Sequence, residues 1–246
     1  MFLLTFETTG PVGACALTDL ETGETRTEET REPKAHLKML LSLTETLYQK
    51  AGVKPADTAV VAASCGPGSY TGIRIGVSSA RAVAQALDIP CISVPTLAMF
   101  RACTEEAPAA VILNARRGQV YGAVYDRGGA EILPPGAYML PDVTKAVRDA
   151  GLADETIFYG DGIDAYATKD PWRAELTGFR FAEPSVRYQT AVLAAAYARE
   201  AWARGAFCTP DELLPEYLRK AEAEQKLEDG TLARLREEKM KRFMSR

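Results

Sequence analysis

The residues best suited to chemistry lie in one short loop, residues 64–72. Within it, Gly66 and Gly68 allow a sharp turn, and Ser69 or Thr71 can cap a helix that begins there. Free backbone N–H groups at a helix N-terminus attract anions, so the loop is a candidate anion site. The alternative is a turn in which glycine serves tight packing of strand against helix, and the residues alone favour that alternative. A Walker loop is excluded because no Gly-Lys-Ser/Thr follows.

Two consecutive arginines, Arg116 and Arg117, follow an apolar run at residues 109–114 that predicts a buried strand. Guanidinium groups at that point can hold a nucleotide phosphate or a carboxylate of a partner. A pair of solvated loop arginines with a structural ion pair fits the pattern equally well. The candidate anion-binding residues are therefore Gly66, Gly68, Ser69, Thr71, Arg116 and Arg117.

Metal and thiol chemistry find little support in the sequence. The chain has one histidine, His36, so no site with two histidine ligands can form within it, and no three or four converging ligands are apparent. The cysteines are odd in number, include no CxxC motif and mostly lie in apolar runs, which is typical of buried free thiols in a reducing cytosol. A nucleophilic cysteine is the less favoured alternative. The five are Cys15, Cys65, Cys91, Cys103 and Cys208.

Length and composition predict a globular protein of one large or two moderate domains. The chain has 246 residues, of which 47% are hydrophobic and 25% charged. No apolar run approaches the roughly 20 residues needed to cross a bilayer, so no membrane contact is expected. The N-terminus lacks a basic start and a cleavage site. Residues 2–7 are therefore predicted to form a first strand rather than a signal peptide, and the protein is expected in the cytoplasm.

Charge is unevenly distributed along the chain. The net charge is −4, yet residues 219–246 carry nine basic and six acidic side chains, so the remainder is distinctly acidic. An acidic body disfavours direct binding of RNA phosphates. The tail is the exception, since Lys239, Lys241, Arg242 and Arg246 can reach an RNA backbone, although a solvated helix of mixed charge is the favoured interpretation.

Hydrophobic periodicity and turn signals predict a β-β-β-α-β-α-β-α order in the first half. That order matches the ribonuclease-H-like unit on which actin, sugar kinases and Hsp70 are built, and a weaker echo follows it. The sequence thus predicts an α/β protein of the actin-like (ASKHA) fold with two lobes, residues 1–104 and 105–217, and a charged helix or tail at 218–246. The expected strands are 2–7, 13–18, 24–30, 58–65, 91–94, 109–114, 119–125, 130–139 and 156–159, and the expected helices are 34–50, 72–87, one from about 96, 142–150 and 190–204.

The first two expected helices have apolar surface to spare. Helix 34–50 bears a leucine-rich stripe wider than one packing contact requires, and helix 72–87 has small residues along one side. Small residues let another helix approach closely, and an approach within the chain is the commoner case. The width of the first stripe nevertheless predicts an exposed two-helix patch.

The segment Gly66–Gly76 is followed by shorter motifs in a fixed order. These are Ala80-Arg81-Ala82, Ser93–Leu97, Asn114–Tyr121, Tyr159–Gly162 and Pro215–Arg219. Together they resemble the TsaB (YeaZ) family, the dimerisation subunit of the bacterial tRNA threonylcarbamoyladenosine machinery. The resemblance spans residues 1–219. Its long Gly-Pro-Gly motif is specific, whereas the other motifs are weak individually.

The resemblance implies a non-catalytic subunit that pairs with a TsaD-like catalytic subunit, which a TsaE-like ATPase joins. The complex transfers a threonylcarbamoyl group to an adenosine next to the tRNA anticodon, and this subunit meets tRNA only through the complex. It implies no cofactor of its own, a place for ATP or ADP at the subunit junction, and a homodimer when the subunit is alone. The implied interface lies on the first two helices, at His36, Leu40, Leu43, Gly72, Ile73, Gly76, Ser79, Ala80 and Val83.

Three positions depart from the family and its catalytic relatives. The catalytic relative holds a metal through two histidines four residues apart on a helix, whereas His36 is followed by Leu40. Actin-like ATPases carry an aspartate in the first strand-turn, and this chain has Glu7, which can bond to the Thr8–Gly10 turn instead. Aspartate often replaces Asn114 in the family. These departures favour a silent subunit over an enzyme.

Two other functions stay open. A metal-dependent, glycoprotease-like peptidase or an ATP-using transferase acting alone is the rival from another class, and the missing metal ligands argue against the peptidase. The second alternative is a regulatory protein of the same fold that acts on the cell wall or on another partner.

Overall fold

The computed structural model describes residues 1–30 and 36–219, without the side chains of residues 36–38. The tail from residue 220 onward, with the four basic residues considered for RNA contact, lies outside the described residues. In the described part, no helix has both the length and the apolar character that a membrane span requires.

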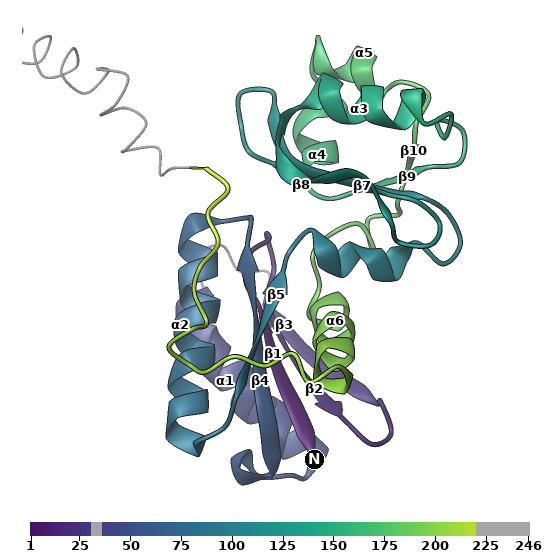
Figure 1. The fold of residues 1–246 in the computed structure, drawn as a ribbon. Coiled ribbons are helices and arrows are strands. Elements are labelled where there is room, and N and C mark those ends of the chain that lie inside the picture. The colour runs from purple at the N-terminus through teal and green to yellow at the C-terminus, as the bar shows by residue number, and fades with distance from the viewer. Residues whose placement is uncertain (31–35, 220–246) are drawn as a thin grey trace, which may run out of the picture.

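The first sheet has five strands in the order β3-β2-β1-β4-β5 (Figure 1). The first three strands form the antiparallel meander that the turn signals predicted, and β4 and β5 run parallel to β1. Parallel pairs need crossover connections, and α1 and α2 supply them. The bounds are β1 (Phe2–Glu7), β2 (Gly13–Asp19), β3 (Thr25–Thr30), α1 (His36–Ala51), β4 (Thr58–Gly66), α2 (Tyr70–Leu87) and β5 (Cys91–Pro95), with a short 3-10 helix η1 (Pro55–Asp57) before β4.

The second sheet repeats the first, in the order β10-β9-β6-β7-β8. Again three antiparallel strands lead, and two parallel strands extend the sheet beyond the first of them. This repeated ribonuclease-H-like unit confirms the predicted actin-like fold with two lobes. The bounds are β6 (Ala109–Asn114), β7 (Gln119–Tyr125), β8 (Glu131–Met139), α3 (Leu140–Asp149), β9 (Ile157–Tyr159), α4 (Gly162–Tyr166), α5 (Trp172–Leu176) and β10 (Arg180–Phe181).

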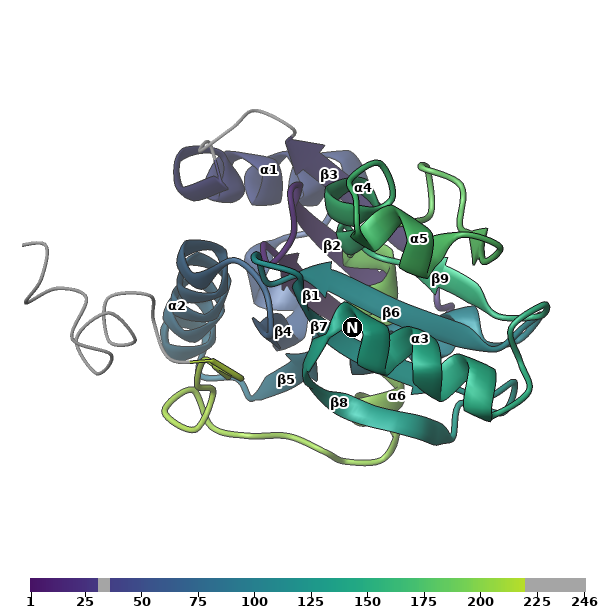
Figure 2. The same cartoon turned by 90° about the horizontal axis from the view of Figure 1, so that it is seen from above.

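Helices cover both faces of the first sheet. α1 and α2 lie side by side on one face, and α6 (Ala191–Ala203) covers the other (Figures 1 and 2). On the second sheet, α3 and α4 pack on one face. Its other face meets the first lobe through one apolar core, to which α6 and the 3-10 helix η2 (Ala98–Cys103) also contribute. The two lobes therefore share buried surface rather than being joined by a linker alone.

Three local expectations differ from the structure. The helix expected from about residue 96 is the 3-10 helix η2. The short elements α4, α5 and β10 were not predicted. Helix α6 falls within the range predicted for the second lobe, yet it packs on β1 and β2 of the first sheet, because its alanine-rich face fits closely against that surface. The lobe boundaries at residues 105 and 217 stay predictions.

The N-terminus of α2 is seated unusually close to β1. A Cβ atom on Gly72 would stand 1.8 Å from the carbonyl oxygen of Thr8, and one on Gly76 would stand 2.5 Å from Thr8 Oγ1. Neither approach is open to a residue with a side chain, so glycine is required at both positions. Thr8 Oγ1 then donates a hydrogen bond of 2.7 Å to the Gly72 carbonyl, which fixes the helix to the strand.

This seating predicts a large effect of one methyl group. Gly72→Ala should lower the free energy of unfolding by about 3 kcal/mol, because the new Cβ meets backbone that cannot move aside. Ser78→Ala, on the exposed side of the same helix, should change it by less than about 0.5 kcal/mol. Urea denaturation followed by circular dichroism measures both. Equal effects would show that the close contact does not matter.

Candidate functional site

A cleft of about 800 Å³ opens where the two lobes meet. The first lobe contributes the turn after β1 and the loop into α2. The second lobe contributes the turn between β6 and β7, and the chain beyond α6 crosses the rim. Of the six candidate anion-binding residues, five line this cleft: Gly68, Ser69, Thr71, Arg116 and Arg117.

Glu7 is not among the residues that line this cleft. Its side chain is fully buried, and Oε1 accepts hydrogen bonds of 2.6 Å from both the backbone N–H and the hydroxyl of Thr9. Burial raises the pKa of this carboxyl, and the hydrogen bonds from Thr9 oppose the rise. Through Oε1, Glu7 therefore holds the turn after β1, while its buried Oε2 has no hydrogen-bond partner among the described residues.

The glycines of the Gly-Pro-Gly loop serve packing. A Cβ on Gly66 would stand 2.3 Å from the carbonyl oxygen of Glu216, and one on Gly68 would stand 2.6 Å from that of Thr9. Ser69 already forms two hydrogen bonds within the chain: its N–H donates to the carbonyl of Thr9, and its hydroxyl accepts from the Gly72 N–H. The packing interpretation therefore suits Gly66 and Gly68, because neighbouring backbone occupies their Cβ positions, whereas Ser69 caps α2 and is exposed to the cleft.

Arg116 and Arg117 remain exposed on the opposite wall. Both have positive φ angles, 65° and 54°, in the turn between β6 and β7. The side chain of Asn114 stabilises that turn, since Oδ1 accepts a 2.8 Å hydrogen bond from the Arg116 N–H and another from Tyr166. The fold thus brings both guanidinium groups to the same cleft as the exposed Thr71 at the start of α2.

Two further polar residues line the cleft that the sequence did not single out for binding. Asp161 accepts a hydrogen bond from the Asn114 N–H, and burial raises the pKa of its carboxyl. Gln189 is 2% exposed, and its Oε1 has no hydrogen-bond partner among the described residues. Asp161 follows a short strand and so was visible only as a motif residue. Gln189 precedes α6, and nothing in its local sequence marks it.

The chain after α6, residues 204–219, forms a strap across the first lobe and the rim of the cleft (Figure 1). Its Glu216 N–H donates to the carbonyl of Cys65, and Arg219 donates to the carbonyl of Ala115 in the second lobe. Between them, the ring of Tyr217 stacks on that of Tyr70 with centroids 4.7 Å apart. The strap thus bridges the two lobes at the cleft.

The predicted interface on α1 and α2 is only partly on the surface. Five members of the predicted set are buried within the chain, where they pack α1 and α2 on the sheet and do not face a partner. They are Leu40, Gly72, Ile73, Gly76 and Ala80. The half-buried members of the predicted set are Leu43, Ser79 and Val83, and the side chain of His36 lies outside the described residues.

One large apolar side chain of α1 does remain on the outside. Leu41, which belongs to the leucine-rich stripe of this helix, is 65% exposed. Leu43, two residues further along α1, is half-buried and lies on a different side of the helix. Apolar surface is therefore present on α1, although at different residues from most of those expected.

A repeated ribonuclease-H-like sheet with a cleft between the copies defines a protein of the actin-like fold. The TsaD family, described as tRNA N6-adenosine threonylcarbamoyltransferase, matches residues 30–227. A solved structure from Pseudomonas aeruginosa, an uncharacterised protein with similarity to peptidase YeaZ, superposes with a TM-score of 0.71 and 25% identity, covering 89% of this chain and 99% of that one.

Two relatives narrow the assignment within that family. The tRNA threonylcarbamoyladenosine biosynthesis protein TsaB of Bacillus subtilis is 32% identical over 121 residues, 47% of this chain and 53% of the relative. TsaB of Escherichia coli is 33% identical over 99 residues, 39% of this chain and 43% of the relative. The chain therefore belongs to the TsaD family and, within it, to the TsaB (YeaZ) group. The matched part spans about half the length of these relatives.

The buried Glu7 predicts a pH-dependent effect. Its pKa in the folded protein lies above the ordinary value of 4.5, so the folded state loses stability relative to the unfolded state as the pH rises from 4.5 through the raised pKa. Glu7→Gln keeps an oxygen for Thr9 and removes that loss. The melting temperature of the variant should exceed that of the wild type by at least about 2 °C above pH 7, and the gap should close towards pH 4.5. A gap that is constant across this range would contradict the buried-charge explanation.

Proposed function

We propose that this chain is a non-catalytic partner subunit of a TsaD-like transferase in the threonylcarbamoylation of adenosine next to the tRNA anticodon. Membership of the TsaB group supports this proposal, because TsaB relatives are named for that biosynthesis. The position of Glu7 supports the non-catalytic part. In this chain, the first-strand carboxylate holds its own turn and is shielded from the cleft.

The observation that carries the partner role is the outer surface of α1 and α2. Leu41 is exposed on α1, and Leu43 on α1 and Ser79 and Val83 on α2 are half-buried, so each helix keeps some apolar surface that the chain itself does not cover. A TsaD-like subunit is the proposed occupant. When the chain is alone, a second copy takes its place, which gives a homodimer.

The proposed complex contains further components besides this chain and the TsaD-like subunit. A TsaE-like ATPase joins the pair, and tRNA is met through the complex rather than by this chain. ATP or ADP binds at the subunit junction, and the residues of this chain proposed to contact its phosphates are Thr71, Arg116 and Arg117, which are exposed along the cleft. The chain itself carries no cofactor in this proposal.

The α2 contact is tested by charge on its outer surface. Val83→Glu should weaken binding of TsaD from the same organism at least tenfold, or about 1.4 kcal/mol, because it places a charge in an apolar interface. Ser79→Arg, one helical turn earlier, should also weaken TsaD binding, because its long side chain keeps the partner from approaching closely. The matched control is Val192→Glu, which is 52% exposed on α6, across the first sheet from α2, and should bind normally.

Isothermal titration calorimetry of folded variants measures these affinities, and sedimentation of each chain alone reports the homodimer. If Val83→Glu and Val192→Glu bind TsaD equally well, the proposed interface is wrong. Weakening by both variants alike would indicate a general loss of structure instead, which their circular dichroism spectra would reveal.

The two arginines in the cleft favour a second candidate, an ATP-using enzyme that acts alone. Under the main proposal, the isolated chain should not turn over ATP with magnesium, and any binding should be weaker than about micromolar. Sub-micromolar binding with turnover by the chain alone, lost in Arg116→Ala, would replace the partner role with an enzyme. A glycoprotease-like activity would appear as cleavage of a protein substrate that a chelator stops.

A further inference from the structure

The strap begins by adding a short antiparallel bridge to the edge of the first sheet. Cys208 of the strap pairs directly with Cys91 of β5. The Cys91 N–H donates to the Cys208 carbonyl at 2.8 Å, and the Cys208 N–H donates to the Cys91 carbonyl at 2.9 Å. Two cysteines thus stand opposite each other where the strap forms a β-bridge with β5.

The spacing of such a pair suits a covalent bond. Residues that exchange both backbone hydrogen bonds have Cα atoms about 5.5 Å apart and side chains on the same face. Disulfides form across Cα separations of about 4.4–6.8 Å. The Cys208 thiol already lies 3.5 Å from the Cys91 carbonyl oxygen, and both cysteines are free.

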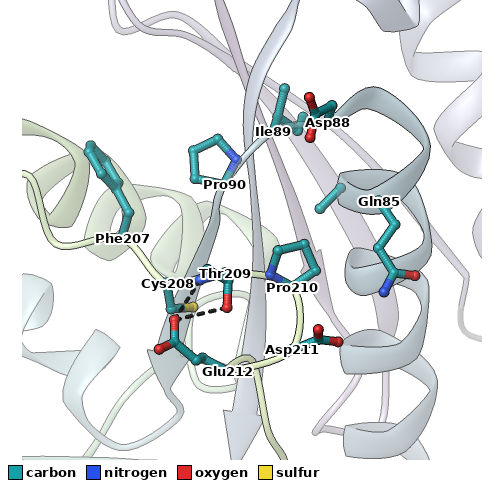
Figure 3. A pocket seen from close by; sticks show the side chains of 11 residues that line it. Gln85, Asp88, Ile89, Pro90, Phe207, Cys208, Thr209, Pro210, Asp211 and Glu212 are labelled. Carbon is teal, nitrogen blue, oxygen red and sulfur yellow. Dashed lines mark hydrogen bonds between the residues drawn. The ribbon is translucent and has the colours of Figure 1, made fainter.

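Reagents can reach the pair from one side. Cys208 lines a pocket of about 620 Å³ between the C-terminal end of α2 and the strap (Figure 3). Pro90 and Phe207 flank it there, and Phe207 is 45% exposed. Cys91 is fully buried behind this opening. An external oxidant therefore meets Cys208 first, and Cys91 is placed to react second.

We propose that Cys91 and Cys208 form a reversible disulfide that fastens the strap to β5 when a small-molecule disulfide is present. Cys208 gives up its proton and attacks that disulfide, which forms a mixed disulfide and releases one thiol. Cys91 then loses its proton and attacks the Cys208 sulfur, which releases the second thiol. Two protein thiols are oxidised to one disulfide, and one external disulfide is reduced to two thiols.

The bond would act on the cleft through the strap. The same strap carries Glu216, Tyr217 and Arg219 to their contacts with both lobes. A disulfide at Cys208 fixes one end of the strap and so restricts how far the strap can move away from the rim of the cleft. The site lies on the edge of β5 and so is distinct from the proposed partner surface on α1 and α2, which means that either proposal can fail without the other.

Trypsin separates all five cysteines, which makes the test direct. Cys91 falls in peptide 82–101 and Cys208 in peptide 205–219, while Cys15, Cys65 and Cys103 fall in 1–26, 51–74 and 102–116. The full chain is incubated with oxidised glutathione, alkylated with N-ethylmaleimide, digested without reductant and analysed by mass spectrometry. The expected product is peptide 82–101 linked to 205–219, which dithiothreitol separates.

Burial sets the expected rate. It raises the pKa of the Cys91 thiol to about 12 and that of the Cys208 thiol above its usual range. The thiolate is the attacking species, so formation of the linked peptide should be slow near pH 7 and about tenfold faster for each added pH unit. Oxidation should also raise the melting temperature by about 5–10 °C, because the new bond closes a long loop.

Variants identify the bond. Cys208→Ser should abolish both the linked peptide and the rise in melting temperature. Cys103→Ser removes another partly buried thiol and should leave both unchanged. The proposal is overturned if 82–101 and 205–219 are recovered unlinked after prolonged oxidation at pH 8.5, if each carries only glutathione, or if either is linked to 51–74 instead.

Discussion

The close seating of α2 on β1 is the contact on which the rest of the structure depends. With no Cβ at Gly72 or Gly76, the helix reaches the backbone of Thr8. That approach sets the loop before it, so that the Ser69 N–H bonds to Thr9 and the turn closes over the carboxyl of Glu7. Backbone donors that an isolated loop would offer to an anion are in part used to hold helix to strand. Two of the N–H groups at this helix start, those of Ser69 and Gly72, are therefore already bonded within the chain.

The order of strands and helices could be predicted from the sequence, but the surroundings of the small residues on α2 could not. Alternating strands, turn residues and the order of elements are local signals, and they gave the repeated fold. The family resemblance assigned the small residues of α2 to a partner surface, whereas Gly72 and Gly76 face Thr8, just after the first strand, and Ala80 is buried in the core. Small residues are required whether the approaching backbone belongs to the same chain or to a partner, so the sequence alone does not distinguish the two contacts. Other features carry no local signal: α4, α5 and β10 are too short for a period, and Gln189 reaches the cleft only through the fold.

The second lobe also contributes to the first. Helix α6 comes after the whole second sheet in the chain, yet it covers the back of the first sheet and supplies alanines to the core that the lobes share. The strap that follows pairs with β5, passes α2 and returns to the second lobe at Ala115. The chain therefore crosses between the lobes several times. Relative motion of the lobes must disturb this core or the strap, which makes the strap contacts the weaker and more adjustable of the two restraints.

The internal repeat offers a comparison within one molecule. The turn after β6 occupies the place in its sheet that the turn after β1 occupies in the first, and both face the cleft. In the first lobe, α2 closes down on the turn. In the second, Trp172 of α5 supports the turn from behind, within about 2.1 Å of where a Cβ on Gly118 would be. That support leaves Arg116 and Arg117 outward, in a left-handed conformation that costs roughly 1 kcal/mol or more for each residue. Strain of that kind is kept only where surrounding structure enforces it. Equivalent turns have thus diverged: the turn after β1 packs against α2, whereas the turn after β6 presents two exposed arginines along the cleft.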